Sequence, residues 1–326
     1  MSSKNYELTL GNCLVTGGAG FIGSHLVDNL MSNNVTTIVL DNLSNGKISN
    51  LSSWNDNPNF KFVEKDLNDF ESLVNLFDDI NTVFHLAADP EVRTGFYHPE
   101  NPYRENIQNT FHLLENIRKS DVESLVFASS STVYGEPSVI PTPENYGPLI
   151  PISPYGSSKL AGEALVSSYC STYGIKGLIF RLANIIGPRS NHGVIPDFIK
   201  KLHNDSTKLE ILGDGKQSKS YIHVSDCVDS FFFCLSKKIR QIEIFNIGTE
   251  DQIDTLYIAD SVIKNMNLEN VKKIPLGGTD GGKGWKGDVT KMQLDISKLR
   301  DLGWQPKFSS AEAIDLTCKA ILNDFR

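Results

Sequence analysis

The sequence predicts an α/β fold in which a doubly wound parallel sheet is followed by a smaller, mixed C-terminal lobe. Two observations support this fold class. Short apolar runs alternate with helical patterns through the first half of the chain, and a glycine-rich loop joins the first run to the first helical pattern. After about residue 182, clusters of Gly, Pro and polar residues interrupt the alternation. We therefore assign residues 1–182 to the sheet domain and residues 183–326 to the lobe, and we expect the chain to interleave between them.

The individual elements follow from local patterns. Apolar runs predict six strands, at 13–16, 36–41, 60–65, 82–87, 124–129 and 177–182. Helical patterns fill the gaps, most clearly at 21–31, 103–119 and 154–173. Repeated β–α units give parallel strands with helices on both faces, and ligands bind where such strands end. The glycine-rich stretch 277–284 is the best candidate for a mobile loop.

Composition and charge exclude several classes of protein. The chain has 326 residues and is 40% hydrophobic, which is enough for a sizeable core. Its formal net charge of -8 argues against a nucleic-acid partner, which favours a basic face. The five cysteines and seven histidines show no disulfide or metal-ligand spacing, so we expect no metal. The polar N-terminus and the short apolar run 231–235 predict a cytoplasmic protein without a membrane partner.

The glycine-rich loop, T-G-G-A-G-F-I-G at 16–23, has the context of a dinucleotide-binding turn in a Rossmann-type sheet. Gly17 permits a tight turn, Gly20 lets the backbone approach a pyrophosphate, and Gly23 lets helix and strand pack closely. The helix that follows points free N–H groups at the phosphates. Glycines at this spacing also occur in turns without a ligand, so the prediction needs support from other residues.

Residues at the ends of the next strands favour NAD as the cofactor. Asp41 can accept hydrogen bonds from both adenosine ribose hydroxyls and would repel the 2′-phosphate of NADP; a turn residue or helix cap is the alternative. Asp66 could meet the adenine amino group or cap the next helix. The small residues in 86–88 (L-A-A) would let the backbone run beside the cofactor.

Ser130, Tyr155 and Lys159 form the predicted catalytic group. Tyr155 and Lys159 are four residues apart, so they share one face of a helix. A phenol with a pKa of about 10 is a poor base at neutral pH, but a nearby ammonium and an oxidised nicotinamide both favour the phenolate. Tyr155 can then take a hydroxyl proton while hydride leaves the same carbon. Ser130 can hold the substrate oxygen and shuttle the proton.

These motifs resemble the extended short-chain dehydrogenase/reductase family, and most closely its UDP-galactose 4-epimerase branch. The resemblance covers essentially the whole chain. It rests on G-x-x-G-x-x-G in the glycine loop, D-N-L-S-x-G at 41–46, S-S-x-T-V-Y-G around Ser130, N-[VI]-x-x-T at 106–110, Y-x-x-x-K at 155–159, R-x-x-N-x-x-G-P at 181–188 and Y-I-H-V-x-D at 221–226.

The residues and the resemblance together predict a full set of site residues. The expected cofactor contacts are Gly17, Gly20, Phe21, Ile22, Gly23, Asp41, Asn42, Ser44, Asn45, Gly46, Asp66, Leu67, Leu86, Ala87, Ala88, Asn106, Ser129, Tyr155 and Lys159. The expected substrate contacts are Ser130, Tyr155, Asn184, Val194, Lys219 and Asp288.

The resemblance implies a UDP-glucose/UDP-galactose 4-epimerase that works through a 4-keto sugar. This sugar rotates to present its other face before hydride returns. Related 4,6-dehydratases and decarboxylases carry an acid before V-Y-G; here Thr132 stands there, with Ser131 before it, which argues against both. UDP-N-acetylglucosamine and UDP-glucuronate 4-epimerases remain alternatives, followed by a UDP-sugar decarboxylase, a keto-sugar reductase and a silent NAD-binding sensor. The family also implies a homodimer through helices 103–119 and 154–173.

The chain departs from the family pattern where the substrate phosphates bind. Lys219 replaces an arginine and loses its bidentate fork. Before Gly287-Asp288, where a second arginine is usual, the segment 283–286 reads K-G-W-K; a lysine could supply the charge, or Trp285 could stack on the uridine or be structural. Met292 falls at the sugar pocket and leaves room for an N-acetyl group. For Arg93 and His98, a solvated loop is preferred over sugar contacts.

Overall fold

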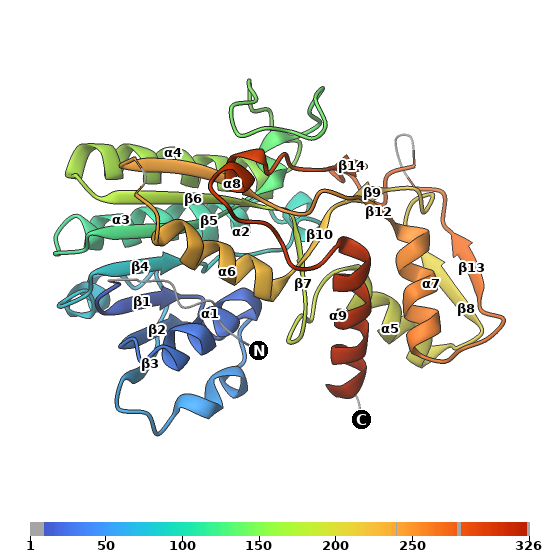
Figure 1. Ribbon diagram of the computed structural model, residues 1–326, viewed down its shortest axis with the longest axis horizontal. Helices are drawn as coiled ribbons and strands as arrows, with labels where there is room; N and C mark the ends of the chain where they lie inside the picture. Colours follow the sequence, from blue (N-terminus) through green and yellow to red (C-terminus); the bar gives the residue numbers. More distant parts are fainter. Residues whose placement is uncertain (1–9, 239, 279–281, 325–326) are drawn as a thin grey trace.

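A computed structural model describes residues 10–238, 240–278 and 282–324 (Figure 1). Its centre is a sheet of seven parallel strands, which confirms the predicted fold class and all six predicted strands. The strand order reverses between β1 and β4, the kind of switch point where α/β sheets bind ligands. From edge to edge the strands are β3 (Phe60–Glu64), β2 (Thr37–Asp41), β1 (Cys13–Thr16), β4 (Thr82–His85), β5 (Ser124–Ser130), β6 (Lys176–Leu182) and β11 (Ile242–Ile247).

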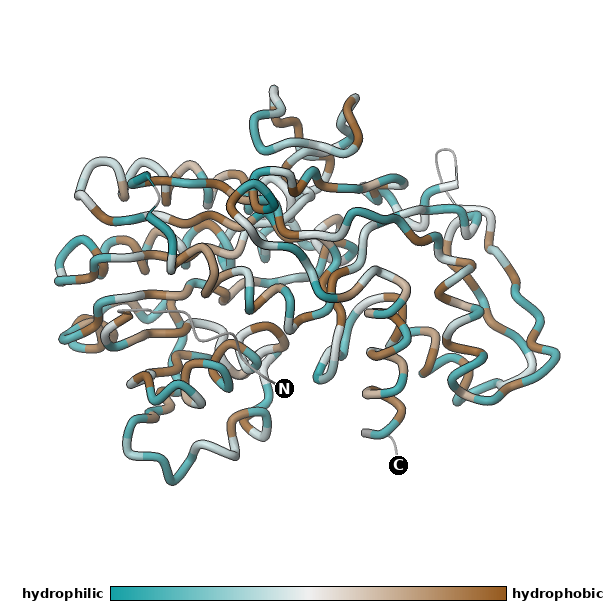
Figure 2. Tube along the Cα trace, viewed as in Figure 1, coloured by the Kyte–Doolittle hydropathy of each residue, from teal (hydrophilic) through white to brown (hydrophobic). Residues whose placement is uncertain are grey.

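Helices cover both faces of this sheet. On one face, α1 (Phe21–Ser32) packs against α6 (Val224–Leu235); on the other, α3 (Asn109–Ile117) packs against α4 (Pro154–Tyr173). Hydrophobic stretches recur along the strands in Figure 2, because neither face is open to water. The helix predicted at 103–119 begins with a wider π-helical segment, Tyr103–Gln108, because apolar spacing identifies the buried face of a helix and not its winding.

The C-terminal lobe has a core of its own, toward the right of Figure 1. Three helices pack together beside a two-stranded parallel pair. These elements are α5 (Val194–Asn204), α7 (Thr255–Asn265), α9 (Ser310–Asp324), β8 (Lys208–Ile211) and β13 (Lys272–Pro275). Their buried side chains include Ile195, Phe198, Ile258 and Ile314.

Short strands and turns connect the two parts. The short strands are β7 (Asn184–Ile186) with β10 (Tyr221–His223), and β9 (Ser218–Lys219) with β12 (Ile253–Asp254) and β14 (Lys291–Met292). The remaining helices are α2 (Glu100–Pro102), α8 (Ser297–Asp301) and the 3-10 segments Ile48–Trp54, Phe70–Leu76, Thr94–Phe96 and Ser131–Tyr134.

The chain passes between the sheet and the lobe more than once. It first leaves the sheet after β6, near the boundary expected at residue 182. It then returns, because α6 packs on α1 and β11 pairs with β6 at the edge of the sheet. Residues 224–238 and 240–247 therefore lie with the sheet domain.

Other expectations concern the remainder of the chain. Of the stretch 277–284, predicted to be mobile, residues 279–281 lie outside the described residues. The five cysteines are free and buried. Within the described ranges, no helix combines the length and the apolar character that crossing a membrane requires.

Candidate active site

A large cavity of about 940 Å³ lies across the carboxyl ends of the central strands. The glycine loop lines one end of it, and residues of the C-terminal lobe line the other. Most of the predicted site residues line this cavity. They are Gly17, Gly20, Phe21, Ile22, Gly23, Asp41, Asn42, Ser44, Asn45, Gly46, Leu67, Leu86, Ala87, Ala88, Ser129, Ser130, Tyr155, Lys159, Asn184, Val194, Lys219 and Asp288.

Two predicted cofactor contacts, Asp66 and Asn106, are not among the lining residues. The Asp66 carboxylate accepts from the Asn68 backbone N–H at 2.8 Å and from the Asn42 side chain at 2.8 Å. Asn106 is buried; its Oδ1 accepts from the Asp89 N–H at 2.7 Å and its Nδ2 donates to Ser158 Oγ at 2.8 Å. Local hydrogen bonds hold both side chains, and their roles as cofactor contacts stay predictions.

The glycine loop forms a cradle that fits a dinucleotide. Gly17 has a φ of +69°, and a Cβ there would lie 2.7 Å from the backbone nitrogen of Ala87. A Cβ at Gly23 would lie 2.2 Å from the Gly17 carbonyl oxygen. Side chains at these positions would force the β1–α1 turn open, so the glycines keep bare backbone at the start of α1, where phosphates can approach it.

Asp41 has a local structural role and also lines the cavity. Its two carboxylate oxygens accept from the backbone N–H groups of Ala19 at 2.9 Å and Leu43 at 2.8 Å, so it holds the glycine loop against the end of β2. Burial raises its pKa, while these hydrogen bonds act in the opposite direction. Each oxygen keeps a second acceptor site, and the residue lines the cavity, so the carboxylate can also receive ribose hydroxyls.

The three predicted catalytic residues come together where β5 and α4 meet. Ser153 starts α4 by accepting from the Gly156 N–H at 3.1 Å, and Pro154 follows it. Tyr155 therefore lies in the first turn and Lys159 one turn later. The Ser130 hydroxyl lowers the pKa of Tyr155, and it accepts from the Thr132 N–H at 3.2 Å. Lys159 is buried, donates to the Ala128 carbonyl at 2.9 Å, and lies 5.9 Å from the centre of the Tyr155 ring.

In the protein without cofactor, burial disfavours the Tyr155 phenolate. Burial raises the pKa of Tyr155 to about 12, with a smaller upward effect of Asp89, although the Ser130 hydrogen bond lowers it. Burial also lowers the pKa of Lys159 to about 8, against the opposing effect of Glu163. A positive charge brought beside Tyr155 by the oxidised cofactor would favour the phenolate.

A buried ion pair beneath the catalytic residues was missed by the sequence analysis. Arg181 on β6 and Glu163 on α4 are 2.7 Å apart, with side chains that are 4% and 5% exposed. The Ser129 hydroxyl donates to the same carboxylate, and Arg181 also donates to the Tyr134 hydroxyl at 2.9 Å. The spacing of Glu163, four residues after Lys159, is the signal that could have revealed it.

A second missed residue is His85, at the end of β4. Its ring nitrogens are bonded to the hydroxyls of Thr16 at 2.8 Å and Thr110 at 2.9 Å. Burial, with a further contribution from Lys159, lowers its pKa to about 3, so the ring is neutral. This bridge joins β1, β4 and the start of α3 directly behind the glycine loop. No spacing in the sequence indicated it.

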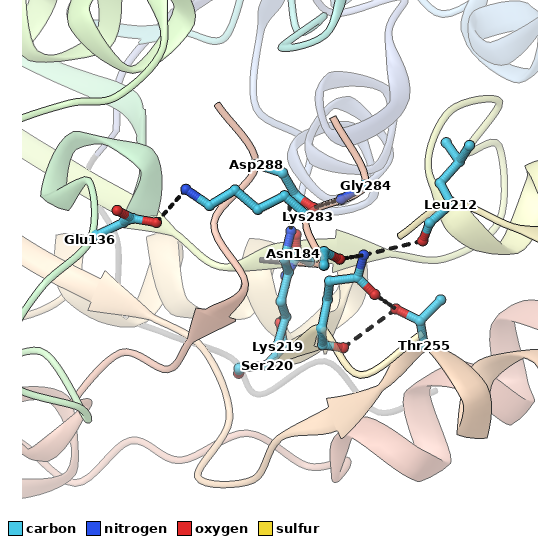
Figure 3. A network of polar contacts seen from close by, with 11 residues as sticks. Glu136, Asn184, Leu212, Lys219, Ser220, Thr255, Lys283, Gly284 and Asp288 are labelled. Atoms are coloured by element: carbon cyan, nitrogen blue, oxygen red, sulfur yellow. Dashed lines mark hydrogen bonds and ion pairs between the residues drawn. The ribbon is translucent and has the colours of Figure 1, made fainter. Parts of the chain in front are cut away.

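In the C-terminal lobe, the expected substrate residues form a connected polar network (Figure 3). Lys219 pairs with the buried carboxylate of Asp288 at 2.7 Å, and Asp288 also accepts from the Gly284 N–H at 3.1 Å. Asn184 donates to the Ser220 carbonyl at 3.0 Å. Lys283 pairs with Glu136 at 2.6 Å, so part of the charge considered for phosphate binding is already engaged.

The lining of the cavity bears on the remaining positions. Met292 and Trp285 line it, whereas Lys283 and Lys286 are not among the lining residues. Arg93 and His98 are exposed, as preferred for a solvated loop, and they also line the cavity. The loop after β4 reaches the C-terminal lobe, and the sequence alone does not show that approach.

The chain belongs to the NAD-dependent epimerase/dehydratase family, whose model matches residues 13–248. A putative UDP-glucose 4-epimerase of Methanocaldococcus jannaschii is 37% identical over 96% of this chain and 99% of its own length. The crystal structure of UDP-glucose 4-epimerase from Thermotoga maritima with UDP-glucose is 34% identical, with a TM-score of 0.86 over 97% of this chain and 100% of that one. UDP-N-acetylglucosamine 4-epimerase from Methanobrevibacter ruminantium is 28% identical, with a TM-score of 0.85 over 96% and 99%.

The chain is therefore an NAD-dependent enzyme of the nucleotide-sugar 4-epimerase/dehydratase class, similar to UDP-glucose 4-epimerases, which are isomerases acting on carbohydrates. NAD is its cofactor.

Glu163→Gln is expected to lower the free energy of unfolding by about 3–5 kcal/mol, because it leaves the buried Arg181 guanidinium without its counter-charge. The double variant Glu163→Gln/Arg181→Met removes both charges and should recover part of this loss. Urea unfolding of the wild type, both single variants and the double variant measures the coupling. Equal instability of the Glu163→Gln and double variants would contradict the ion-pair interpretation.

The stability of the wild type relative to Lys159→Met is expected to rise with pH above about 8. The folded-state pKa of Lys159, about 8, lies below its usual 10.5, so between these values the unfolded chain binds more protons than the folded one. Stability then increases by about 1.4 kcal/mol per pH unit. Urea unfolding of both proteins without nucleotide, from pH 7.5 to 9.5, measures the difference between their free energies of unfolding. The titration of other groups cancels in this difference. A pH-independent difference would count against the lowered pKa.

Proposed function

We propose that this enzyme interconverts UDP-glucose and UDP-galactose by inverting the configuration at C4 of the sugar. The observation that carries this proposal is the meeting of Ser130, Tyr155 and Lys159 at the cavity, beside the glycine cradle. Hydroxyl residues, Ser131 and Thr132, follow Ser130 and line the same wall. Elimination of water from the sugar would need an acid–base group in addition to Tyr155. Hydroxyl side chains there favour oxidation and reduction at a single carbon.

Residues at one end of the cavity carry out the proton transfers, and residues at the other end hold the nucleotide. NAD, when bound, supplies the acceptor and donor of hydride. Tyr155 takes the proton of the C4 hydroxyl, and Ser130, which lines the same cavity, holds the substrate oxygen. Tyr155 returns the proton when the 4-keto sugar has turned its other face. Asn184 and Lys219, in the C-terminal lobe, hold the nucleotide while the sugar turns.

UDP-N-acetylglucosamine is the second candidate substrate. Met292 lines the cavity, and its flexible side chain can move to admit an N-acetyl group. The relative from Methanobrevibacter ruminantium is named as an epimerase of this sugar nucleotide. UDP-glucuronate would need a cation for its carboxylate and is the third candidate.

We also propose that the enzyme is a cytoplasmic homodimer in which α3 and α4 of two copies pack together. Large side chains on these helices support this surface: Phe111 is 43% exposed and Tyr173 is 50% exposed. Light scattering of the purified chain measures the mass directly. A mass near the 36.1 kDa of one chain would contradict the proposal.

Incubation of the purified protein with UDP-galactose, without added NAD, is expected to yield UDP-glucose, detected by chromatography. Tyr155→Phe should lower kcat by about 100- to 10,000-fold and keep NAD bound, because only the general base is lost. Tyr257→Phe, at an exposed position on α7, is the matched control.

Each outcome of this assay has a distinct meaning. Unchanged behaviour of Tyr155→Phe in an active preparation would remove the tyrosine from the mechanism. An absence of conversion after NAD is added would contradict the UDP-hexose assignment, and conversion of UDP-N-acetylglucosamine or UDP-glucuronate would then identify the substrate.

A further inference from the structure

Trp285 presents an unusual donor to the cavity. Its side chain lines the cavity, yet its indole Nε1 is buried and has no hydrogen-bond partner among the described residues. A buried N–H group without an acceptor costs about 1–3 kcal/mol. This cost would be relieved by a ligand that places an acceptor atom beside the ring.

Two cations flank the Trp285 ring. The Arg93 guanidinium lies 5.7 Å from the ring centre and the Lys219 ammonium lies 5.5 Å from it. Both distances allow cation–π attraction. Arg93 belongs to the loop after β4 in the sheet domain, whereas Trp285 and Lys219 belong to the C-terminal lobe. The ring therefore connects the two sides of the cavity.

The charges of these cations are not equally available. Lys219 is neutralised by Asp288 at 2.7 Å, and Lys283 by Glu136 at 2.6 Å (Figure 3). For Arg93, the interaction in the described structure is with the Trp285 ring, and no carboxylate there pairs with it. Arg93 is also exposed, so its donors are free to meet a ligand.

A further contact holds the Arg93 loop near the lobe. Glu91, two residues earlier, pairs with His192 at 3.0 Å, just before α5 begins. This contact and the Arg93–Trp285 contact both cross the cavity. They place the guanidinium beside Trp285 and Lys219 before any ligand arrives.

We propose that Arg93 and Trp285 together bind the diphosphate of the nucleotide-sugar substrate, from opposite sides of the cavity. This proposal rests on the proposed function. The planar guanidinium supplies a fork of donors that matches phosphate oxygens, and the indole N–H supplies one more. Arg93 thus provides the positive charge that Lys219, paired with Asp288, does not provide alone.

Titration calorimetry with UDP and with uridine tests the proposal. Arg93→Gln should weaken UDP binding about tenfold or more, because charge-assisted hydrogen bonds are lost, and should change uridine binding less than about twofold. Trp285→Phe keeps an aromatic ring at this position but removes the indole N–H. This variant should weaken UDP binding by about three- to tenfold. Arg300→Gln, an exposed arginine paired with Glu250 away from the cavity, is the matched control.

Fluorescence gives a second readout, because UDP should change the tryptophan emission of the wild type but not of Trp285→Phe, which keeps Trp54 and Trp304. The proposal is overturned if the wild type binds UDP and Arg93→Gln binds it equally well, or if Arg93→Gln weakens uridine as much as UDP. A wild type that binds no UDP would instead overturn the proposed function on which this inference rests.

Discussion

The geometry of the active site depends on the buried ion pair between Glu163 and Arg181. Glu163 lies on the same helix as Tyr155 and Lys159, Arg181 lies on β6, and Ser129 on β5 donates to the shared carboxylate. The Glu163 carboxylate therefore joins α4, which carries Tyr155, to β5, which carries Ser130. A shift of α4 along the sheet would separate the two buried charges without giving them water, which would cost free energy. The position of the helix relative to the strands is therefore held firmly.

The burial of residues on α4 also affects the ionisation of Tyr155. Burial that fixes Tyr155 and Lys159 in place also disfavours the charged form of each side chain, so the protein alone keeps the phenol protonated. An oxidised nicotinamide beside Tyr155 would favour the phenolate. Packing of the chain thus positions Tyr155 and Lys159 before any ligand binds, whereas the bound cofactor changes the basicity of Tyr155. Experiments can measure the two effects separately.

The sequence predicted the fold well because its signals are local. Alternating apolar runs identify strands, and the Ser153-Pro154 start of α4 places Tyr155 and Lys159 one turn apart. Side-chain partners are less predictable, because tertiary contacts decide them. The hydrogen bonds of Asp66 with Asn42 and of Asn106 with Asp89 and Ser158 follow from no local pattern. The approach of Arg93 to Trp285, nearly two hundred residues later in the chain, is likewise a tertiary contact that the sequence does not show.

The C-terminal lobe has a hydrophobic core that does not merge with that of the sheet. Lobe residues that line the cavity and lie outside the sheet core, such as Lys219, can therefore be replaced without disturbing the packing that aligns the catalytic group. Selection can act on the two tasks at different rates: a lineage can acquire a new sugar nucleotide through changes in the lobe and inherit the reaction intact.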